Sequence, residues 1–153
     1  MKATWYFLHM LGQVAWIGGA LAAMVIGAAA KREEPARMGM VARLQNAIYR
    51  LLIGPGAMVT VLSGLLLTLQ MYNQVTAVGL SHSLMTMQLV GIIAGVWVLV
   101  HTVPNSNKLA RLEPVGPTAV AFAAIRQRVV VSGMVSSLLA LLGLVTGALY
   151  QIR

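Results

Sequence analysis

The chain has 153 residues, of which 59% are hydrophobic and only 9% are charged. Soluble domains carry about 25% charged residues, so this composition excludes an ordinary water-soluble globular protein. The 11 Lys and Arg residues outnumber the 3 Asp and Glu residues, and there is no cysteine. Because no basic patch with interleaved aromatic residues occurs, nucleic-acid binding is not expected, and the lack of cysteine excludes covalent c-type haem attachment.

Apolar segments occur at about residues 5–30, 51–72, 84–103 and 129–150. At 1.5 Å per residue, each is long enough to cross a hydrocarbon core of about 30 Å. Backbone groups in lipid must pair within their own segment, which favours helices. The sequence therefore predicts an all-α integral membrane four-helix bundle, with residues 1–153 forming a single transmembrane domain. The first segment is too long for the apolar part of a cleavable signal peptide.

The first segment carries small and aromatic residues at alternating spacings of three and four. This stripe comprises His9, Gly12, Trp16, Gly19 and Ala23. Small residues at helical spacing let helices approach closely, so His9 is expected to point into the bundle. Two interpretations of His9 stay open. It either ligates haem iron or copper, with Gly12, Trp16 and Gly19 lining the site, or hydrogen-bonds Gln13 or a neighbouring helix and only fixes the packing.

The positive charges predict the orientation of the bundle. They gather in the connections 31–50 and 104–128, whereas the connection from Asn73 to Ser83 has no charge. Because positive residues stay on the cytoplasmic side, both basic connections should be cytoplasmic. The predicted topology is up-down-up-down, with the N- and C-termini outside. Both basic connections are expected to contain helix.

The later segments also contain small residues at helical spacing, which predict close packing. The second segment has Gly56, Thr60 and Gly64 at four-residue steps, after a Gly54-Pro55-Gly56 sequence that should kink or loosen the helix. The third segment has Gly91 and Gly95. The fourth has Gly133, Ser137, Ala140 and Gly147 on roughly one side.

Further candidate metal ligands fall toward the same outer end as His9. They are Met10, His82, Met85 and Met87. Thioether and imidazole groups together suit Cu(I), and a His/Met pair can also hold haem. The alternative is that the methionines fill gaps in the core and that His82 is exposed at the interface. His101 lies toward the opposite end of the third segment.

Ionisable groups are missing from the apolar segments. No Asp, Glu, Lys or Arg occurs between Trp5 and Ala30, or between Leu51 and Val103. Proton pumps and ion-coupled transporters need such a relay, so the sequence argues against both classes.

The run from Leu8 to Gly19 resembles the first helix of the copper-resistance D family of bacterial inner-membrane proteins and of the HemJ-type protoporphyrinogen oxidases. The shared pattern is His9, Trp16 seven residues later, and the pair Gly18-Gly19. The first resemblance implies copper handling and a bacterial inner (cytoplasmic) membrane, with the termini periplasmic. The second implies that His9 binds haem b. HemJ-type enzymes also use a lysine in a later helix. This chain has no lysine between Lys31 and Lys108, so that oxidase activity is not expected.

These observations predict a membrane protein that binds haem b, or less favourably copper, through His9. The alternative is a non-catalytic accessory subunit of a larger respiratory or photosynthetic membrane complex, with no chemistry of its own. In both cases the lipid bilayer is the principal environment.

Overall fold

The computed structural model describes residues 2–70 and 82–151, and every element in these ranges is helical. The main elements are α1 (Lys2–Ala29), α2 (Met38–Ile48), α3 (Gly54–Gln70), α5 (His82–Trp97), α6 (Val103–Leu109) and α7 (Ala119–Gln151). The predicted all-α class is confirmed for this part of the chain. Residues 71 and 72 of the second predicted segment, and the connection that follows as far as residue 81, lie outside the described residues.

Several elements join into longer rods. α2 runs through a π-helical turn (Tyr49–Ile53) into α3, and α5 runs through a second π-helical turn (Val98–Thr102) into α6. The described residues thus contain 4 helices that are long and apolar enough to cross a membrane, at Lys2–Arg32, Pro35–Gln70, Leu84–Leu109 and Gly116–Ala148. The chain is an integral, multi-pass membrane protein by these criteria.

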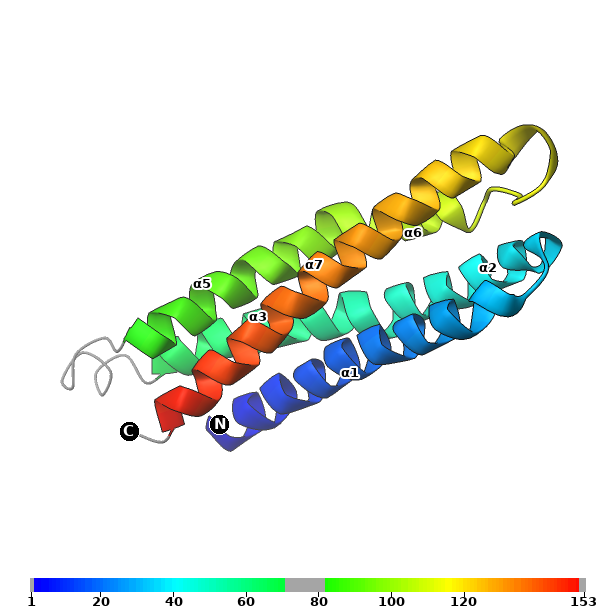
Figure 1. Cartoon of the computed structure of the whole chain (residues 1–153). Coiled ribbons are helices and arrows are strands. Elements are labelled where there is room, and N and C mark those ends of the chain that lie inside the picture. Colours follow the sequence, from blue (N-terminus) through cyan, green and yellow to red (C-terminus); the bar gives the residue numbers. More distant parts are fainter. Residues whose placement is uncertain (1, 71–81, 152–153) are drawn as a thin grey trace.

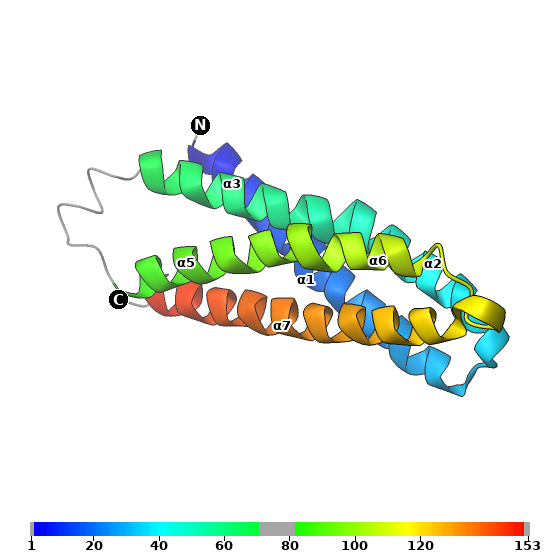
Figure 2. The ribbon, with the colours of Figure 1, turned by 90° about the horizontal axis from the view of Figure 1, so that it is seen from above.

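The rods lie lengthwise beside one another as a bundle (Figure 1). α1 begins and α7 ends at one end, which we call the terminal end, and the connections after α1 and after α6 lie at the other, which we call the basic end (Figure 2). The predicted bundle is confirmed. Which end faces the cytoplasm stays a prediction from the positive charges.

The bundle consists of two closely packed helix pairs. α1 packs along α3, and α5 packs along α7, whereas α1 touches α7 at few positions. We call the loosely packed line between α1 and α7 the seam. Many large apolar side chains face outward, such as Phe7 and Val14 at 63% and 66% exposed, as expected for a surface covered by lipid.

One residue separates each π-helical turn from a proline. The backbone N–H of Gly54 donates to the Tyr49 carbonyl, and that of Val103 donates to the Val98 carbonyl. Pro55 and Pro104 follow these residues. Proline has no N–H and its ring clashes with the carbonyl four residues back, so a widened turn relieves the clash without ending the helix. The predicted irregularity near Pro55 therefore takes the form of a π-turn.

The predicted stripes agree with the structure in part. Gly12, Trp16, Gly19 and Ala23 are buried on one side of α1. In α5, a Cβ added to Gly95 would lie 2.7 Å from Val61, but one added to Gly91 would meet nothing within 4 Å. The prediction that Gly91 lies at a close helix contact is therefore wrong. Gly95 is the contact residue.

Candidate functional site

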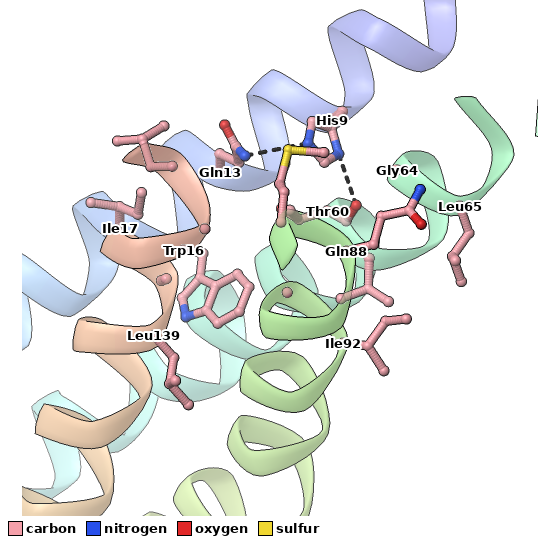
Figure 3. Close-up of a pocket in the computed structure, with 16 residues that line it drawn as sticks. His9, Gln13, Trp16, Ile17, Thr60, Gly64, Leu65, Gln88, Ile92 and Leu139 are labelled. Atoms are coloured by element: carbon pink, nitrogen blue, oxygen red, sulfur yellow. Dashed lines mark hydrogen bonds between the residues drawn. The ribbon is translucent and has the colours of Figure 1, made fainter. Parts of the chain in front are cut away.

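His9 lies on α1 near the terminal end of the bundle, with its imidazole turned toward α3 (Figure 3). Its Nδ1 lies 2.8 Å from the backbone carbonyl oxygen of Thr60. A carbonyl can only accept, so this bond requires the proton on Nδ1. The Ser63 hydroxyl oxygen lies 3.3 Å from the same nitrogen and is a weaker second acceptor. The α3 backbone therefore fixes both the orientation of the ring and its neutral tautomer.

The other ring nitrogen keeps its lone pair. The Gln13 amide nitrogen lies 3.3 Å from His9 Nε2 and donates a long hydrogen bond to it. This is the only hydrogen bond to Nε2 among the described residues. Imidazoles that ligate metals characteristically donate their other N–H to a carbonyl or a carboxylate, which fixes the tautomer. His9 has this arrangement, and the same bonds to Gln13 and to α3 are those expected of a histidine that only fixes the packing.

Glycines bring Thr60 within reach of His9. A Cβ added to Gly12 would lie 2.8 Å from the Thr60 backbone nitrogen and 2.9 Å from the Gly56 carbonyl oxygen. One added to Gly64 would lie 3.0 Å from His9 Cε1. The α1 and α3 backbones thus meet directly where these residues face one another, and the His9 ring fits into the space left by Gly64.

Two adjoining cavities lie next to His9, and residues of α1, α3, α5 and α7 line both. The narrower has a volume of about 60 Å³ and includes Trp16 and Gly91 in its walls. The wider has a volume of about 280 Å³ and includes Met10 and Gly147. His9 lines both of them. Their walls are mostly apolar, so a group bound here would be shielded from water.

Two buried polar atoms in this region have no hydrogen-bond partner among the described residues. They are the indole nitrogen Nε1 of Trp16, which is 3% exposed, and the hydroxyl oxygen of Thr60, which is 7% exposed. Both residues line the narrower cavity. Buried donors are almost always paired, so these two favour a site that receives a further polar group.

The structure brings together only part of the predicted metal-ligand set. His9, Met10 and Met87 line the wider cavity. Met85 is 52% exposed and His82 is exposed, and neither lines either cavity. In residues 2–70 and 82–151, no group of three or more His, Asp or Glu side chains could hold a metal ion.

Of the predicted cofactor-site residues, Trp16 lines the narrower cavity, whereas Gly12 and Gly19 pack against α3 and the turn that precedes it. His101 is exposed and stacks on Trp97, with ring centroids 4.5 Å apart, in a separate surface groove near the basic end.

Sequence reasoning identified His9 but missed its acceptor. Thr60 was on the four-residue stripe of the second segment, where it counted only as a packing residue. The signal that could have indicated its contact with His9 is that Thr60 is a polar residue on a stripe of small residues. Gln88 forms the link between helices that an amide within an apolar segment predicts, since it donates to the Thr68 hydroxyl of α3.

Searches of protein-family models, of curated proteins and of solved structures found no match to this chain.

Proposed function

We propose that this protein binds haem b in the cavities at the terminal end, where His9 Nε2 would hold the iron. One observation carries the proposal. The Thr60 carbonyl accepts the Nδ1 proton of His9 at 2.8 Å, which makes Nε2 the acceptor nitrogen of the ring in a mostly apolar cavity. Nε2 accepts only the long bond from the Gln13 amide at 3.3 Å among the described residues, and an iron ion at Nε2 would replace that bond.

The residues present fit this group in chemistry and partly in space. Cavities that bind small molecules usually measure about 300–1,000 Å³, and the wider cavity here is about 280 Å³. The narrower one adjoins it and adds about 60 Å³. Entry of a porphyrin therefore requires the seam to widen, which the sparse packing of α1 against α7 favours.

The side chains around His9 have separable roles. His9 would hold the iron, and Thr60 would keep the imidazole in its ligating orientation. Met87, which lines both cavities, is the candidate for a second side chain that would hold the iron. Gly143 lines both cavities as well and leaves room for a flat ring beside α7. Haem in such an apolar site supplies one-electron redox chemistry.

Copper is the second candidate, and it has its own supporting observation. His9, Met10 and Met87 line one cavity, which gives an imidazole and two thioethers, a donor set that suits Cu(I). The resemblance of residues 8–19 to the copper-resistance D family and to the HemJ-type proteins supports both candidates, since His9 is the residue that carries it.

The protein should lie in the bacterial inner membrane with its basic end in the cytoplasm. The connections at that end hold most of the cations of the chain, and short positive loops are retained on the cytoplasmic side. The cavities beside His9 would then open toward the periplasmic half of the bilayer.

The test is the absorption spectrum and metal content of the protein purified in mild detergent. We expect a Soret band that is lost in His9→Ala and retained in His82→Ala, because His82 is exposed and lines neither cavity. Bound copper without a Soret band would favour the second candidate, provided that His9→Ala loses the copper. Absence of both would contradict both and leave the accessory-subunit interpretation, which co-purification with a larger complex would test.

A further inference from the structure

A third cavity lies in the α1–α7 seam, at the opposite end of the bundle from His9. Its volume is about 260 Å³, and it lies mainly between α1 and α7, with Tyr49 and Leu109 closing its inner side. We call it the basic-end crevice. It shares no lining residue with the cavities beside His9.

Two cations line this crevice, Lys31 after α1 and Arg126 in α7. Lys31 is exposed and Arg126 is half-buried. The ion pairs found among the described residues are Glu33–Arg37 at 3.0 Å and Glu113–Arg43 at 3.4 Å, and neither includes a crevice cation. No carboxylate lines the crevice. Its positive charge is therefore free to attract an anion.

The crevice is polar at its mouth and mostly apolar along its length. α1 runs toward the basic end and α7 runs away from it, so Lys31 and Arg126 lie at the same end. Ala20 and Ser137, eleven residues further along each helix, lie about 16 Å deeper by the rise of an α-helix. Met24, Val130 and Met134 line the stretch between.

One hydroxyl faces this space without a partner in the protein. A Cβ added to Gly133 would lie 3.0 Å from the Tyr49 hydroxyl oxygen, which therefore borders the seam. No hydrogen bond to it occurs among the described residues. The neighbouring Gln45 amide already has a hydrogen-bond partner, because it donates to the Ala23 carbonyl at 2.8 Å. Tyr49 can thus donate to an acceptor inside the crevice.

We propose that the basic-end crevice binds one anionic glycerophospholipid. Its phosphate lies between Lys31 and Arg126, its ester oxygens accept from the Tyr49 hydroxyl, and one acyl chain fills the apolar stretch along α1 and α7. A lipid meets both halves of the crevice, since its headgroup matches the charge and its chain matches the apolar walls. This proposal does not depend on whether haem binds at the other end.

The experiment is native mass spectrometry of the full chain released from detergent, after incubation with phosphatidylglycerol or with phosphatidylcholine. We expect the wild type to retain one phosphatidylglycerol and to prefer it to phosphatidylcholine. The variant Lys31→Gln/Arg126→Gln should reduce phosphatidylglycerol retention by on the order of tenfold or more. The matched control Arg50→Gln/Arg111→Gln removes the same charge outside the crevice, from two exposed residues, and should retain the lipid like the wild type.

A third variant tests the acyl-chain half without changing charge. Val130→Trp should fill the crevice from α7, where Val130 is 47% exposed, and should also reduce phosphatidylglycerol retention. Equal retention of the two lipids by the wild type would overturn the proposal. Equal losses of phosphatidylglycerol in the two double variants would also overturn it, because the lipid would then follow surface charge anywhere at the basic end. Full retention of phosphatidylglycerol by Val130→Trp would overturn it too, because the acyl chain would then not occupy the crevice. Helicity and monodispersity of every variant establish that the compared proteins are folded.

Discussion

The two sides of α1 are packed in opposite ways. Toward α3, its backbone comes so close that a Cβ on Gly12 would lie 2.6 Å from the Thr60 hydroxyl oxygen. Toward α7, the same helix leaves cavities of about 280 Å³ near one end and about 260 Å³ near the other. One helix thus combines an interface that holds the bundle together with a seam that has room for other molecules.

This difference follows from the way helices associate in lipid. No hydrophobic effect drives apolar helices together in a membrane, so close backbone approach and hydrogen bonds decide which pairs are firm. Gly12 and Gly56 provide that approach between α1 and α3. The seam has fewer such contacts. We infer that stability resides mainly within the pairs and binding capacity between them.

The largest effect is expected at the α1–α3 interface. Gly12→Ala should lower the free energy of unfolding by about 3 kcal/mol, because the added methyl group meets the backbones of Thr60 and Gly56. Thermal unfolding in detergent, followed by circular dichroism, measures this loss. Gly18→Ala is the matched control on the same helix, since its Cβ would meet nothing within 4 Å. Equal melting temperatures of the two variants would contradict the interface described here.

A smaller effect is expected within the α5–α7 pair. The Ser132 hydroxyl receives the Trp97 indole N–H at 3.0 Å and shares a hydrogen bond with the Thr102 hydroxyl at 2.7 Å. Ser132→Ala leaves both groups unpaired and should cost about 1–2 kcal/mol. The same unfolding assay applies. Thr146→Val removes a hydroxyl that, among the described residues, bonds within its own helix, and it should change stability by less. A larger loss for Thr146→Val would show that this network does not hold the pair.

The smallest effect on stability is expected at the narrower cavity beside His9, where α5 contributes Gly91. Gly91→Leu places a side chain where a Cβ meets nothing within 4 Å, so the free energy of unfolding should change by less than about 1 kcal/mol. The leucine would enter the narrower cavity beside Trp16, so the haem or copper content should fall severalfold. Absorbance and metal analysis of the folded variant measure the content. Unchanged content would place the bound group elsewhere, and a large loss of stability would remove the contrast between the α1–α3 interface and the cavity.

Periodicity in the sequence was sufficient to predict α1. Its stripe of Gly12, Trp16, Gly19 and Ala23 is buried, because small residues interrupt an otherwise bulky apolar helix. Which face of α5 and which face of α7 pack against the other helices was harder to predict. Gly91 is not a contact residue, and Ser136 is more buried than the predicted Ser137. Lipid and protein neighbours are both apolar, so hydropathy does not distinguish the faces of such helices.

The sequence predicts the α1 residue of the candidate site but not its partner on α3. His9 is conspicuous as a histidine within an apolar run, but its acceptor is a backbone carbonyl, and all residues have one. Which carbonyl lies within 2.8 Å depends on how far α1 slides along α3. The glycines that set this register, Gly12 and Gly56, belong to separate segments, and a single sequence does not show that they meet.

The most direct test of the account is the nitrogen chemical shift of the His9 ring. The chain has 3 histidines, so the variant His82→Gln/His101→Gln, labelled with ¹⁵N-histidine, reports on His9 alone. In its lipid-reconstituted, cofactor-free form, the account predicts a neutral ring with the proton on Nδ1 and an unprotonated Nε2. A proton on Nε2, or a ring that titrates like one in free water, would contradict it.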